Sequence, residues 1–441
     1  MSTRMTRREF VELGTAAAVG TALAPGAMGQ AAAASDKPVR FGVAGTGNRG
    51  RGLLGVLMQM KGVECPAVCD INPDAAAMAQ DIVEKSGRPR PEAYTQGEEA
   101  YRKMMERDDL DAVLIASPWH WHAPMAVYGM KMRKYTAVEV PAALSVDECW
   151  DLVRTHEATG VPCMMLENWS FRRDNLAVLN MIRQGLFGDI VHCHCAHSHD
   201  CLDHWFFDDK GNMRWGGEYL VRYNRDQYPT HSLGPVLSWL NINCGDYYAH
   251  ATSMATDSRA INHYFARKFG PDHPNARRKY AQGDIVTTVV RTHRGRTIVI
   301  NYDMQLPRPY DNRWMVQGLD GLYDENKGVP KVYIRGRSAQ YHQWESFDPY
   351  QEKFEHSWWK AIKALPPEVG HGGTDYLELQ QFVRAVREKT QTPIDVYDSV
   401  LMCVIIPLSE ESIARGGAPV ACPDFTGGRW KTNKPRFAME A

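Results

Sequence analysis

The sequence predicts an α/β protein in which a doubly wound parallel sheet is followed by an α+β region with a largely antiparallel open sheet. Three observations support this prediction. A buried strand leads directly into a glycine-rich turn and a helix, strands and helices then alternate, and after about Leu166 the strand-like runs become longer. We therefore expect a first domain over residues 35–165 and a second over residues 166–441.

The elements of the first domain follow from hydrophobic periodicity. The apolar run Val39–Ala44 is typical of a buried strand, and the spacing of Leu53, Leu54, Val56 and Leu57 predicts a helix directly after it. The remaining pattern predicts a strand over 64–69, helices over 73–86 and 98–107, and strands over 112–116 and 136–140. Alternation of this kind is typical of a parallel sheet with helices on both faces.

The second domain has a different pattern of apolar runs. Strand-like runs cover residues 190–195, 285–292, 297–303 and 314–317, and helical stretches cover 175–184, 233–240 and 376–388. The aromatic and charged composition of residues 206–228 predicts a long loop. Long loops are where substrate contacts concentrate.

Composition excludes several classes of protein. The 441 residues carry 51 basic and 52 acidic side chains, a net charge of −1, without basic runs. Such a chain offers no electrostatic footprint for nucleic acid or an anionic membrane. With 12 Trp, 19 Tyr and 13 Phe it also has too much apolar surface for a disordered protein.

The first 34 residues have the pattern of a twin-arginine export signal. The letters TRREF at residues 6–10 precede a small, apolar run over 13–24 and four alanines at 31–34. No later segment reaches the roughly 18 apolar residues of a membrane span. We expect a mature chain that begins near Ser35, lies in the periplasm or outside the cell, and keeps most of its ten cysteines in the core.

The turn after the first strand has the pattern of a dinucleotide site. Gly45, Gly47 and Gly50 form a G-x-G-x-x-G sequence between strand and helix, and Asp70 ends the next strand twenty residues after Gly50. The glycines permit a tight turn, close approach of a pyrophosphate and close helix packing, while the helix N-terminus attracts the phosphates. Because a carboxylate accepts from ribose hydroxyls and repels a 2′-phosphate, Rossmann-type binding of NAD is expected rather than NADP.

Further motifs follow in order along the chain: SPWHWH at 117–122, EV at 139–140, EN at 167–168, RRD at 172–174, HD at 199–200, YPTH at 228–231, QGDIVT at 282–287, RPY at 308–310, HGG at 371–373 with DY at 375–376, DVYD at 395–398 and PDF at 423–425. As a set they resemble the glucose-fructose oxidoreductase and inositol dehydrogenase (Gfo/Idh/MocA) superfamily. Within it the chain is most similar to the NAD-dependent glycosidases typified by bacterial α-N-acetylgalactosaminidase.

The resemblance implies a set of cofactor contacts beyond the glycines and Asp70. Dehydrogenases of the superfamily usually have Glu-Lys-Pro where this chain has Glu139, Val140 and Pro141, and the missing lysine favours the glycosidase branch. The implied contacts are Asn48, Arg49, Trp119, His120, Trp121, His122, Glu139, Val140, Asn168 and Tyr228.

The resemblance also implies a redox-neutral hydrolysis of an α-linked N-acetylhexosamine or related sugar. NAD takes a hydride from sugar C3, the C2 proton and the aglycone leave, water adds, and the hydride returns. An exported enzyme needs such a closed cycle because it has no dependable pool of free NAD. We expect His231 to be the base and Tyr228 its partner, with substrate contacts from His197, Arg222, Tyr228, Pro229, Thr230 and His231.

Alternative interpretations remain open at this point. His231 could cap a helix, Tyr228 could be a packing residue, and Trp119 and Trp121 could belong to the core. The chain could also be an exported sugar oxidoreductase or transhydrogenase with tightly bound NAD(P), or a catalytically silent carbohydrate-binding protein, and it could form a homo-oligomer. Ser170, Phe171 and His197 depart from the family pattern on the substrate side, and a Trp-Arg pair is missing near 219–227, so the sugar is not determined.

The segment 192–204 is rich in histidine and cysteine. On a strand, Cys193, Cys195, His197 and His199 would share one face, which suggests a metal site. Neighbours on one face of a strand lie about 7 Å apart, however, so four of them cannot reach one ion. We therefore expect no metal here, but buried cysteines beside pocket-lining histidines.

Overall fold

The first sheet of the computed structural model is parallel and has the order β3-β2-β1-β4-β5-β6 within the described residues, 37–362 and 370–440. Its strands are β1 (Val39–Ala44), β2 (Val63–Cys69), β3 (Glu92–Tyr94), β4 (Ala112–Ile115), β5 (Tyr135–Glu139) and β6 (Cys163–Leu166). The order reverses between β1 and β4, and in such sheets ligands bind at the carboxyl ends of the strands next to this point.

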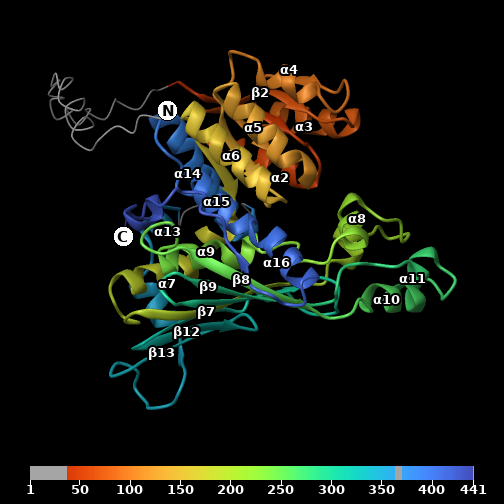
Figure 1. The fold of residues 1–441 in the computed structure, drawn as a ribbon. Coiled ribbons are helices and arrows are strands. Elements are labelled where there is room, and N and C mark those ends of the chain that lie inside the picture. Colours follow the sequence, from red (N-terminus) through yellow and green to blue (C-terminus); the bar gives the residue numbers. More distant parts are fainter. Residues whose placement is uncertain (1–36, 363–369, 441) are drawn as a thin grey trace, which may run out of the picture. The chain divides into compact units, whose positions relative to one another are not determined.

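Helices cover both faces of the parallel sheet (Figure 1). They are α2 (Asn48–Leu57), α3 (Pro73–Lys85), α4 (Ala100–Met105), α5 (His122–Lys131) and α6 (Val146–Thr159). Helix α5 contacts both α4 and α6 on one face, and the later helix α14 (Thr374–Glu388) packs beside α2. Right-handed crossovers between parallel strands produce this division of the helices.

The second sheet is mixed, mostly antiparallel, and has the order β14-β13-β12-β11-β7-β10-β9-β8-β15 among the described residues. Only β7 and β10 run parallel to each other in it, with His197 of β7 opposite Tyr302 of β10. The strands are β7 (Ile190–Ser198), β8 (Tyr248–Ala255), β9 (Val286–Thr292), β10 (Thr297–Asp303), β11 (Trp314–Gly318), β12 (Gly321–Asn326), β13 (Val329–Ile334), β14 (Glu345–Ser346) and β15 (Val420–Ala421).

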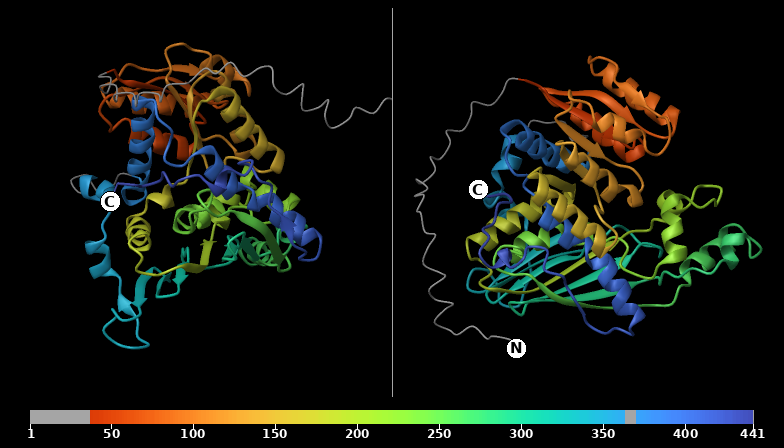
Figure 2. Two further views of the ribbon diagram at one scale, coloured as in Figure 1. Left: turned by 60° about the vertical axis from the view of Figure 1, so that its left-hand side comes forward. Right: turned by 45° about the horizontal axis from the view of Figure 1, so that its top comes forward.

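One face of this sheet is covered by helices and the other is open (Figure 2). Along β9 buried and more exposed residues alternate, which is the pattern of a sheet with one solvated face. Helix α9 (Thr230–Leu240) packs on β7, and α16 (Ile405–Ala414) packs on β8. The other helices of this region are α7 (Arg173–Arg183), α8 (Trp215–Arg222), α10 (Ala260–Lys268), α11 (Pro274–Arg277), α12 (Asp348–Lys353), α13 (Ser357–Ile362) and α15 (Val396–Cys403).

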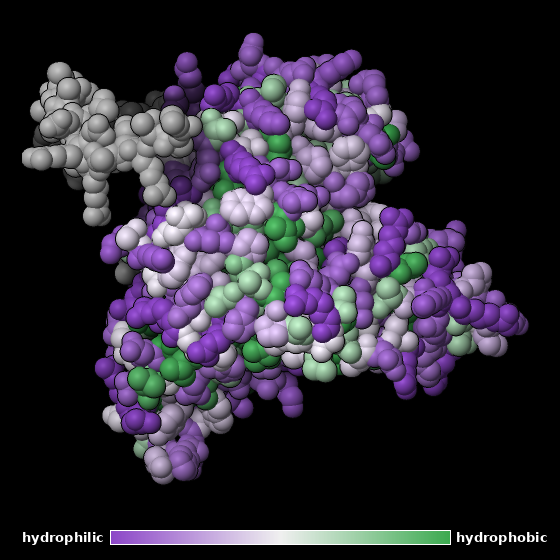
Figure 3. Space-filling view, in the orientation of Figure 1, coloured by the Kyte–Doolittle hydropathy of each residue, from purple (hydrophilic) through white to green (hydrophobic). Residues whose placement is uncertain are grey.

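The two sheets share packing partners. Residues 36–441 form one compact unit, in which α15 contacts both β6 of the first sheet and α9 of the second. On the face drawn in Figure 3, hydrophobic side chains gather in the middle, where Figure 1 draws α15 and α16, and hydrophilic ones dominate over α10 and α11. The elements that carry the candidate site are therefore held by a common core.

The predicted fold class is confirmed, and the differences concern element ends and loops. The bounds predicted for β1, β2, α3, α4, β4 and β5 agree with the observed ones within two residues, whereas β3 and β6 were not predicted. The stretch 206–228 is wrong as a continuous loop, because its Trp215–Arg222 segment forms α8, which buries Gly216, Gly217 and Leu220. The division at residues 165 and 166 stays a prediction.

The remaining expectations have separate outcomes. The proposed signal at 1–34 lies outside the described residues. Among the described helices, none combines the length and the apolar character needed to cross a membrane. All ten cysteines are free thiols, and eight of them are buried, as expected for core residues.

Candidate active site

The glycine turn between β1 and α2 leaves no room for side chains at its first and third glycines. A Cβ on Gly45 would lie 2.4 Å from the Ser117 backbone nitrogen, and one on Gly50 would lie 1.9 Å from the Gly45 carbonyl oxygen. At Gly47 a Cβ would meet no atom within 4 Å. The turn is therefore packed tightly against the protein on one side and open at its middle glycine, where a pyrophosphate would approach.

Asp70 supports this turn from the end of β2. One carboxylate oxygen accepts hydrogen bonds from the backbone nitrogen of Thr46 at 2.7 Å and from its hydroxyl at 3.1 Å. The other accepts from the backbone nitrogen of Asn72 at 2.9 Å. Within the described residues, Gly47 at the N-cap of α2 has no side-chain capping bond, so the first amides of this helix face the same opening.

Arg49 lies beside this opening and joins the two parts of the chain. Its guanidinium contacts Glu139 at 2.6 Å and Asp375 of α14 at 2.6 Å, while the Asn168 amide donates to Asp375 at 2.8 Å. Burial opposes ionisation of Asp375, but His371 and Arg49 together hold the pKa of its carboxyl below the usual range. The cluster is an ionic clamp at the carboxyl ends of β5 and β6.

The segment Trp119–His122 consists of a short 3₁₀ helix, Trp119–Trp121, and the first residue of α5, next to the same edge. Trp119 is buried and stacks on Tyr228, with ring centroids 5.6 Å apart and planes at 18°. Trp121 packs against Tyr101, and His120 is exposed. The ring nitrogens of His122 lie 2.8 Å and 2.7 Å from the carbonyl oxygens of Pro141 and Ser117, so this histidine ties together the loops after β4 and β5.

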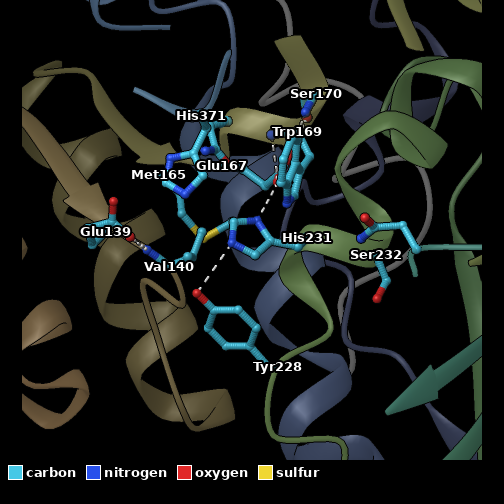
Figure 4. A network of polar contacts seen from close by, with 12 residues as sticks. Glu139, Val140, Met165, Glu167, Trp169, Ser170, Tyr228, His231, Ser232 and His371 are labelled. Atoms are coloured by element: carbon cyan, nitrogen blue, oxygen red, sulfur yellow. Dashed lines mark hydrogen bonds and ion pairs between the residues drawn. The ribbon is translucent and has the colours of Figure 1, made fainter. Parts of the chain in front are cut away.

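A carboxylate, an imidazole and a phenol form a chain of polar contacts (Figure 4). Glu167 Oε1 lies 2.7 Å from His231 Nδ1, and His231 Nε2 lies 3.4 Å from the Tyr228 hydroxyl. Because Glu167 is completely buried and His231 comes from the first turn of α9, the contact joins the end of β6 to the second region. A carboxylate on Nδ1 favours the tautomer whose Nε2 accepts a proton.

Local sequence explains the position of Glu167. It caps the short helix Asn168–Phe171, accepting from the Trp169 backbone nitrogen at 3.1 Å and the Ser170 backbone nitrogen at 2.7 Å. Helix α9 approaches this carboxylate closely because residue 234 is glycine: a Cβ there would lie 1.7 Å from Glu167 Oε2. Both bonds hold the carboxylate at a fixed angle to the imidazole.

The pair of His231 and Tyr228 lies among aromatic rings. His197, nearly buried, has its ring centroid 5.0 Å from Tyr228, 5.5 Å from His231 and 5.5 Å from Tyr310. Burial, and then His231 and His199, keep the pKa of His197 well below its usual value, so its imidazole is neutral. Within the described residues His197 Nδ1 has no hydrogen-bond partner, which leaves a polar atom for a ligand.

The tyrosine of the pair is an uncharged phenol in this structure. Burial, together with the negative charge of Glu139, raises the pKa of Tyr228 well above its ordinary value, although Arg49 acts in the opposite direction. The phenol can therefore donate a proton to Nε2 of His231, but it cannot act as a standing anion.

The other predicted substrate residues are placed differently. Thr230 is fully buried at the start of α9 with no partner for its hydroxyl among the described residues, and Pro229 is the N-cap of this helix. Arg222 ends α8 with an exposed side chain 3.4 Å from Glu218. The structure brings His197, Tyr228 and His231 together, and no contact joins Arg222 to them in the part of the chain that it describes. The roles assigned to these residues stay predictions.

Three residues of the site were not predicted as functional. Glu167 orients His231, Asp375 holds Arg49, and Tyr310 lines the aromatic wall. Glu167 could have been found as an acid directly after a strand at the binding edge of a parallel sheet. Asp375 lies 326 residues from Arg49, and no local signal relates the two.

The residues present fit NAD. The open middle glycine, the uncapped first turn of α2 and the carboxylate at the end of β2 are the three parts that a dinucleotide requires. Next to them, the Ser117 hydroxyl and the side-chain amide oxygen of Asn168 are buried without partners among the described residues. Gly45, Gly47, Gly50 and Asp70 would hold the cofactor, and Arg49, Glu139 and Asn168 lie beside it.

Comparison with known families agrees with an NAD site at this position. Residues 39–167 match the oxidoreductase family with an NAD-binding Rossmann fold. Residues 171–432 match the C-terminal domain of glycosyl hydrolase family 109.

The sequence relatives cover the whole chain. An α-N-acetylgalactosaminidase from Tannerella forsythia is 39% identical, with 98% of this chain and 99% of the relative aligned. A glycosyl hydrolase family 109 protein from Stenotrophomonas maltophilia is also 39% identical, with 99% of each chain aligned.

Solved structures show the same fold at low sequence identity. Levoglucosan dehydrogenase in complex with NADH and levoglucosan has a TM-score of 0.68 at 18% identity and covers 88% of this chain and 100% of its own. The myo-inositol dehydrogenase from Lactobacillus casei in complex with NAD(H) and myo-inositol has a TM-score of 0.62 at 15% identity, covering 89% and 99%. With a Rossmann region for NAD and a matching second region, this chain belongs to glycosyl hydrolase family 109 and is a glycoside hydrolase.

Proposed function

We propose that the enzyme hydrolyses an α-linked N-acetylhexosamine, or a related sugar, by transient oxidation at C3, elimination between C1 and C2, addition of water and re-reduction. When bound, NAD accepts a hydride from C3 and gives it back at the end of the cycle, so that none is consumed. The protein supplies the proton transfers and the orientation of the sugar.

The contact chain from Glu167 through His231 to Tyr228 carries this proposal. Glu167 holds the proton of His231 on Nδ1, which leaves Nε2 as the basic atom on the side of the Tyr228 phenol. This arrangement is a general base with a fixed tautomer, and it needs no second carboxylate across the glycosidic bond.

Tyr228 acts as a relay in the proposed cycle. Its neutral phenol passes its proton to Nε2 of His231 as its oxygen accepts the proton of the C3 hydroxyl. His231 is 13% exposed, so it can exchange this proton with water before the C2 proton is removed. The two proton transfers then occur one after the other at the same imidazole.

The substitution of lysine by Val140 supports the glycosidase chemistry over that of a dehydrogenase. Val140 is buried and offers only its backbone nitrogen, which donates to Glu139 Oε2 at 3.1 Å. No ammonium group therefore stands at the position where the related dehydrogenases carry their lysine, and His231 remains as the base.

The proposed class of sugar is inferred from the relatives, and one residue of this chain departs from their pattern. The α-N-acetylgalactosaminidase of Tannerella forsythia gives the type of substrate. His197 stands where the family resemblance implies a tyrosine, so a hydroxyl next to the sugar is replaced by an imidazole. We therefore propose the class of α-linked hexosamines without choosing among its members.

Aryl glycosides in heavy water, without added NAD, test the reaction. Release of the aryl group together with deuterium at sugar C2 is the expected result, because C2 loses its proton to a group that exchanges with solvent. Release without deuterium at C2 would exclude the elimination route, and oxidation of free sugar without hydrolysis would favour an oxidoreductase. A matched series of α- and β-linked galactosaminides and glucosaminides then ranks the sugars and the linkages.

We also propose that the chain is exported folded by the twin-arginine route and acts in the periplasm or outside the cell. The TRREF sequence at residues 6–10 supports this, and a recycled NAD that is loaded before export suits such a compartment. Fractionation of cells that express the chain, compared with an Arg7→Lys, Arg8→Lys variant, tests it. Retention of the variant in the cytoplasm is expected, and equal export of both would contradict the proposal.

A further inference from the structure

A second group of chemically reactive side chains lies at the end of β7, beyond the residues that the proposed reaction uses. One nitrogen each of His199 and His204 and the sulfur of Cys201 lie within 4.8 Å of one another. Cys201 is buried, His199 is half-buried and His204 is exposed. The group is distinct from the set of Cys193, Cys195, His197 and His199 considered from the sequence.

Backbone geometry places the first two side chains together. The backbone nitrogen of His199 donates to the Asp303 carbonyl at 2.8 Å, and that of Cys201 donates to the Met304 carbonyl at 3.1 Å. His204 then lies on a single π-helical turn, Leu202–Phe206, that folds back toward them. Single π-turns are common at functional sites because they re-aim side chains.

One nitrogen of the His199 ring is engaged and the other is available as a ligand. Its Nδ1 lies 3.1 Å from the Asp200 carbonyl oxygen, a contact in which Nδ1–H donates and Nε2 keeps its lone pair. Histidines that bind metals commonly donate their second nitrogen to a carbonyl or carboxylate in this way. The ring centroids of His199 and His204 are 5.1 Å apart.

We propose that His199, Cys201 and His204 bind one divalent ion of the zinc type, with a fourth position open to water. Two imidazoles and a thiolate are ligands that zinc accepts in sites with three protein ligands. With metal–ligand bonds of about 2.0–2.3 Å, the ligand atoms would be roughly 3.3–3.7 Å apart, so the side chains close by about 1 Å on binding. The exposed His204 gives the ion a path from solvent.

The cysteine would bind as a thiolate. On binding, the Cys201 thiol gives its proton to solvent and its sulfur forms the bond to the metal.

The proposed ion lies beside the aromatic rings around His197 and takes no part in the proposed reaction. The His199 ring lies 4.9 Å from Tyr310, which in turn lies 5.5 Å from His197. A bound ion would hold His199 in place and with it the outer side of this aromatic wall. The proposal does not depend on the proposed function, since binding is measured without substrate.

Titration of the full-length, chelator-treated protein with Co²⁺ tests the site. We expect one equivalent to bind with a thiolate-to-cobalt charge-transfer band, and Zn²⁺ to displace it. Cys201→Ser should remove the band, and His204→Ala should weaken binding roughly tenfold or more. His204 is exposed, so its replacement should leave the fold intact.

Matched controls use a cysteine and a histidine from outside the cluster. Cys195→Ser replaces another buried cysteine of the same segment, and His263→Ala removes an exposed histidine of α10. Both variants should bind Co²⁺ as the parent protein does. Absence of a stoichiometric charge-transfer band in the parent protein, or a band that survives Cys201→Ser, would overturn the proposal.

Discussion

The cofactor side of the site, around Gly47, Asp70 and Arg49, and the sugar side, around His197, Tyr228 and His231, differ in how their polar groups are paired. On the cofactor side, charged groups are paired within the protein: Arg49 contacts Glu139 and Asp375, and Asp70 accepts from Thr46. On the sugar side, aromatic rings surround polar atoms that lack close partners in the described structure. His197 Nδ1 has none, and the Tyr228 hydroxyl has a long contact of 3.4 Å.

This difference shows which side has its charged groups in place before a ligand binds. Paired charges keep their positions before anything binds, so the cofactor side is organised in advance. Buried polar atoms without partners are costly unless a ligand satisfies them, and they occur on both sides: His197 Nδ1 on the sugar side, Ser117 Oγ and Asn168 Oδ1 on the cofactor side. Glu167 lies between the two, because it is fixed by backbone amides at the end of β6 and acts on His231.

The largest effect should come from His231→Ala, which should impair the sugar side and leave the cofactor side unchanged. Loss of the general base should reduce turnover roughly 10³–10⁴-fold. NAD binding should be unchanged, because the glycine turn and Asp70 are not involved. Steady-state rates with aryl glycosides and fluorescence titration with NAD measure the two effects. Equal losses of turnover and of NAD affinity would show that the sides are not separable.

The second-largest effect should come from Glu167→Gln. It should reduce kcat roughly 10²-fold, because a neutral amide no longer fixes the proton on Nδ1 of His231. Since Glu167 acts through His231, it is a positioning residue, and the pH profile is the informative measurement. The variant should change the pH dependence of kcat, whereas Ser170→Ala, which removes only the hydroxyl bond to Glu167, should leave the profile unchanged. An unaltered pH profile in the Glu167→Gln variant would show that Glu167 acts only as a helix cap.

Gly50→Ala should damage the cofactor side alone. The added methyl would lie 1.9 Å from the Gly45 carbonyl, so the turn must open, at about 1–3 kcal/mol of stability and with loss of NAD affinity. Gly52→Ala is the matched control in the same helix, because a Cβ there meets nothing within 4 Å. Thermal unfolding and NAD titration compare them, and equal behaviour of both variants would contradict a tightly packed turn.

Sequence predicted the cofactor side better because its signals are local. The spacing of Gly45, Gly47 and Gly50 and the acid at Asp70 lie within 26 residues and imply both a fold and a ligand. The doubly wound parallel sheet was predicted from the alternation of strands and helices, and the structure has it.

The sugar side depends on long-range contacts that periodicity does not encode. His231 and Tyr228 were identified through a family motif, but their contact with Glu167, 64 residues earlier, requires the close approach that Gly234 permits. Helix α8 was missed because Trp215, Gly216 and Gly217 have the composition of a loop. The packing of the two glycines against Trp205, Phe206 and Met213 overrides that tendency.

The smallest effect concerns a carboxyl below the cofactor side that is not part of the ionic clamp. Glu378 of α14 is completely buried, and neither of its oxygens has a hydrogen-bond partner among the described residues. Burial, and then the charges of Asp375 and Glu139, raise its pKa well above the ordinary value. A carboxyl whose pKa is higher in the folded than in the unfolded state lowers stability as pH rises above the unfolded value of about 4.3.

Glu378→Gln should therefore stabilise the protein, and the gain should depend on pH. The amide keeps the shape and cannot ionise, so the melting temperature of the variant should exceed that of the parent at pH 8 and match it near pH 4. Glu388→Gln, an exposed position at the end of the same helix whose pair with Arg384 contributes at most about 1 kcal/mol, serves as the control. A gain of equal size at both pH values would contradict a raised pKa for Glu378, and a loss of stability at pH 8 would mean that Glu378 is ionised and paired in the folded protein.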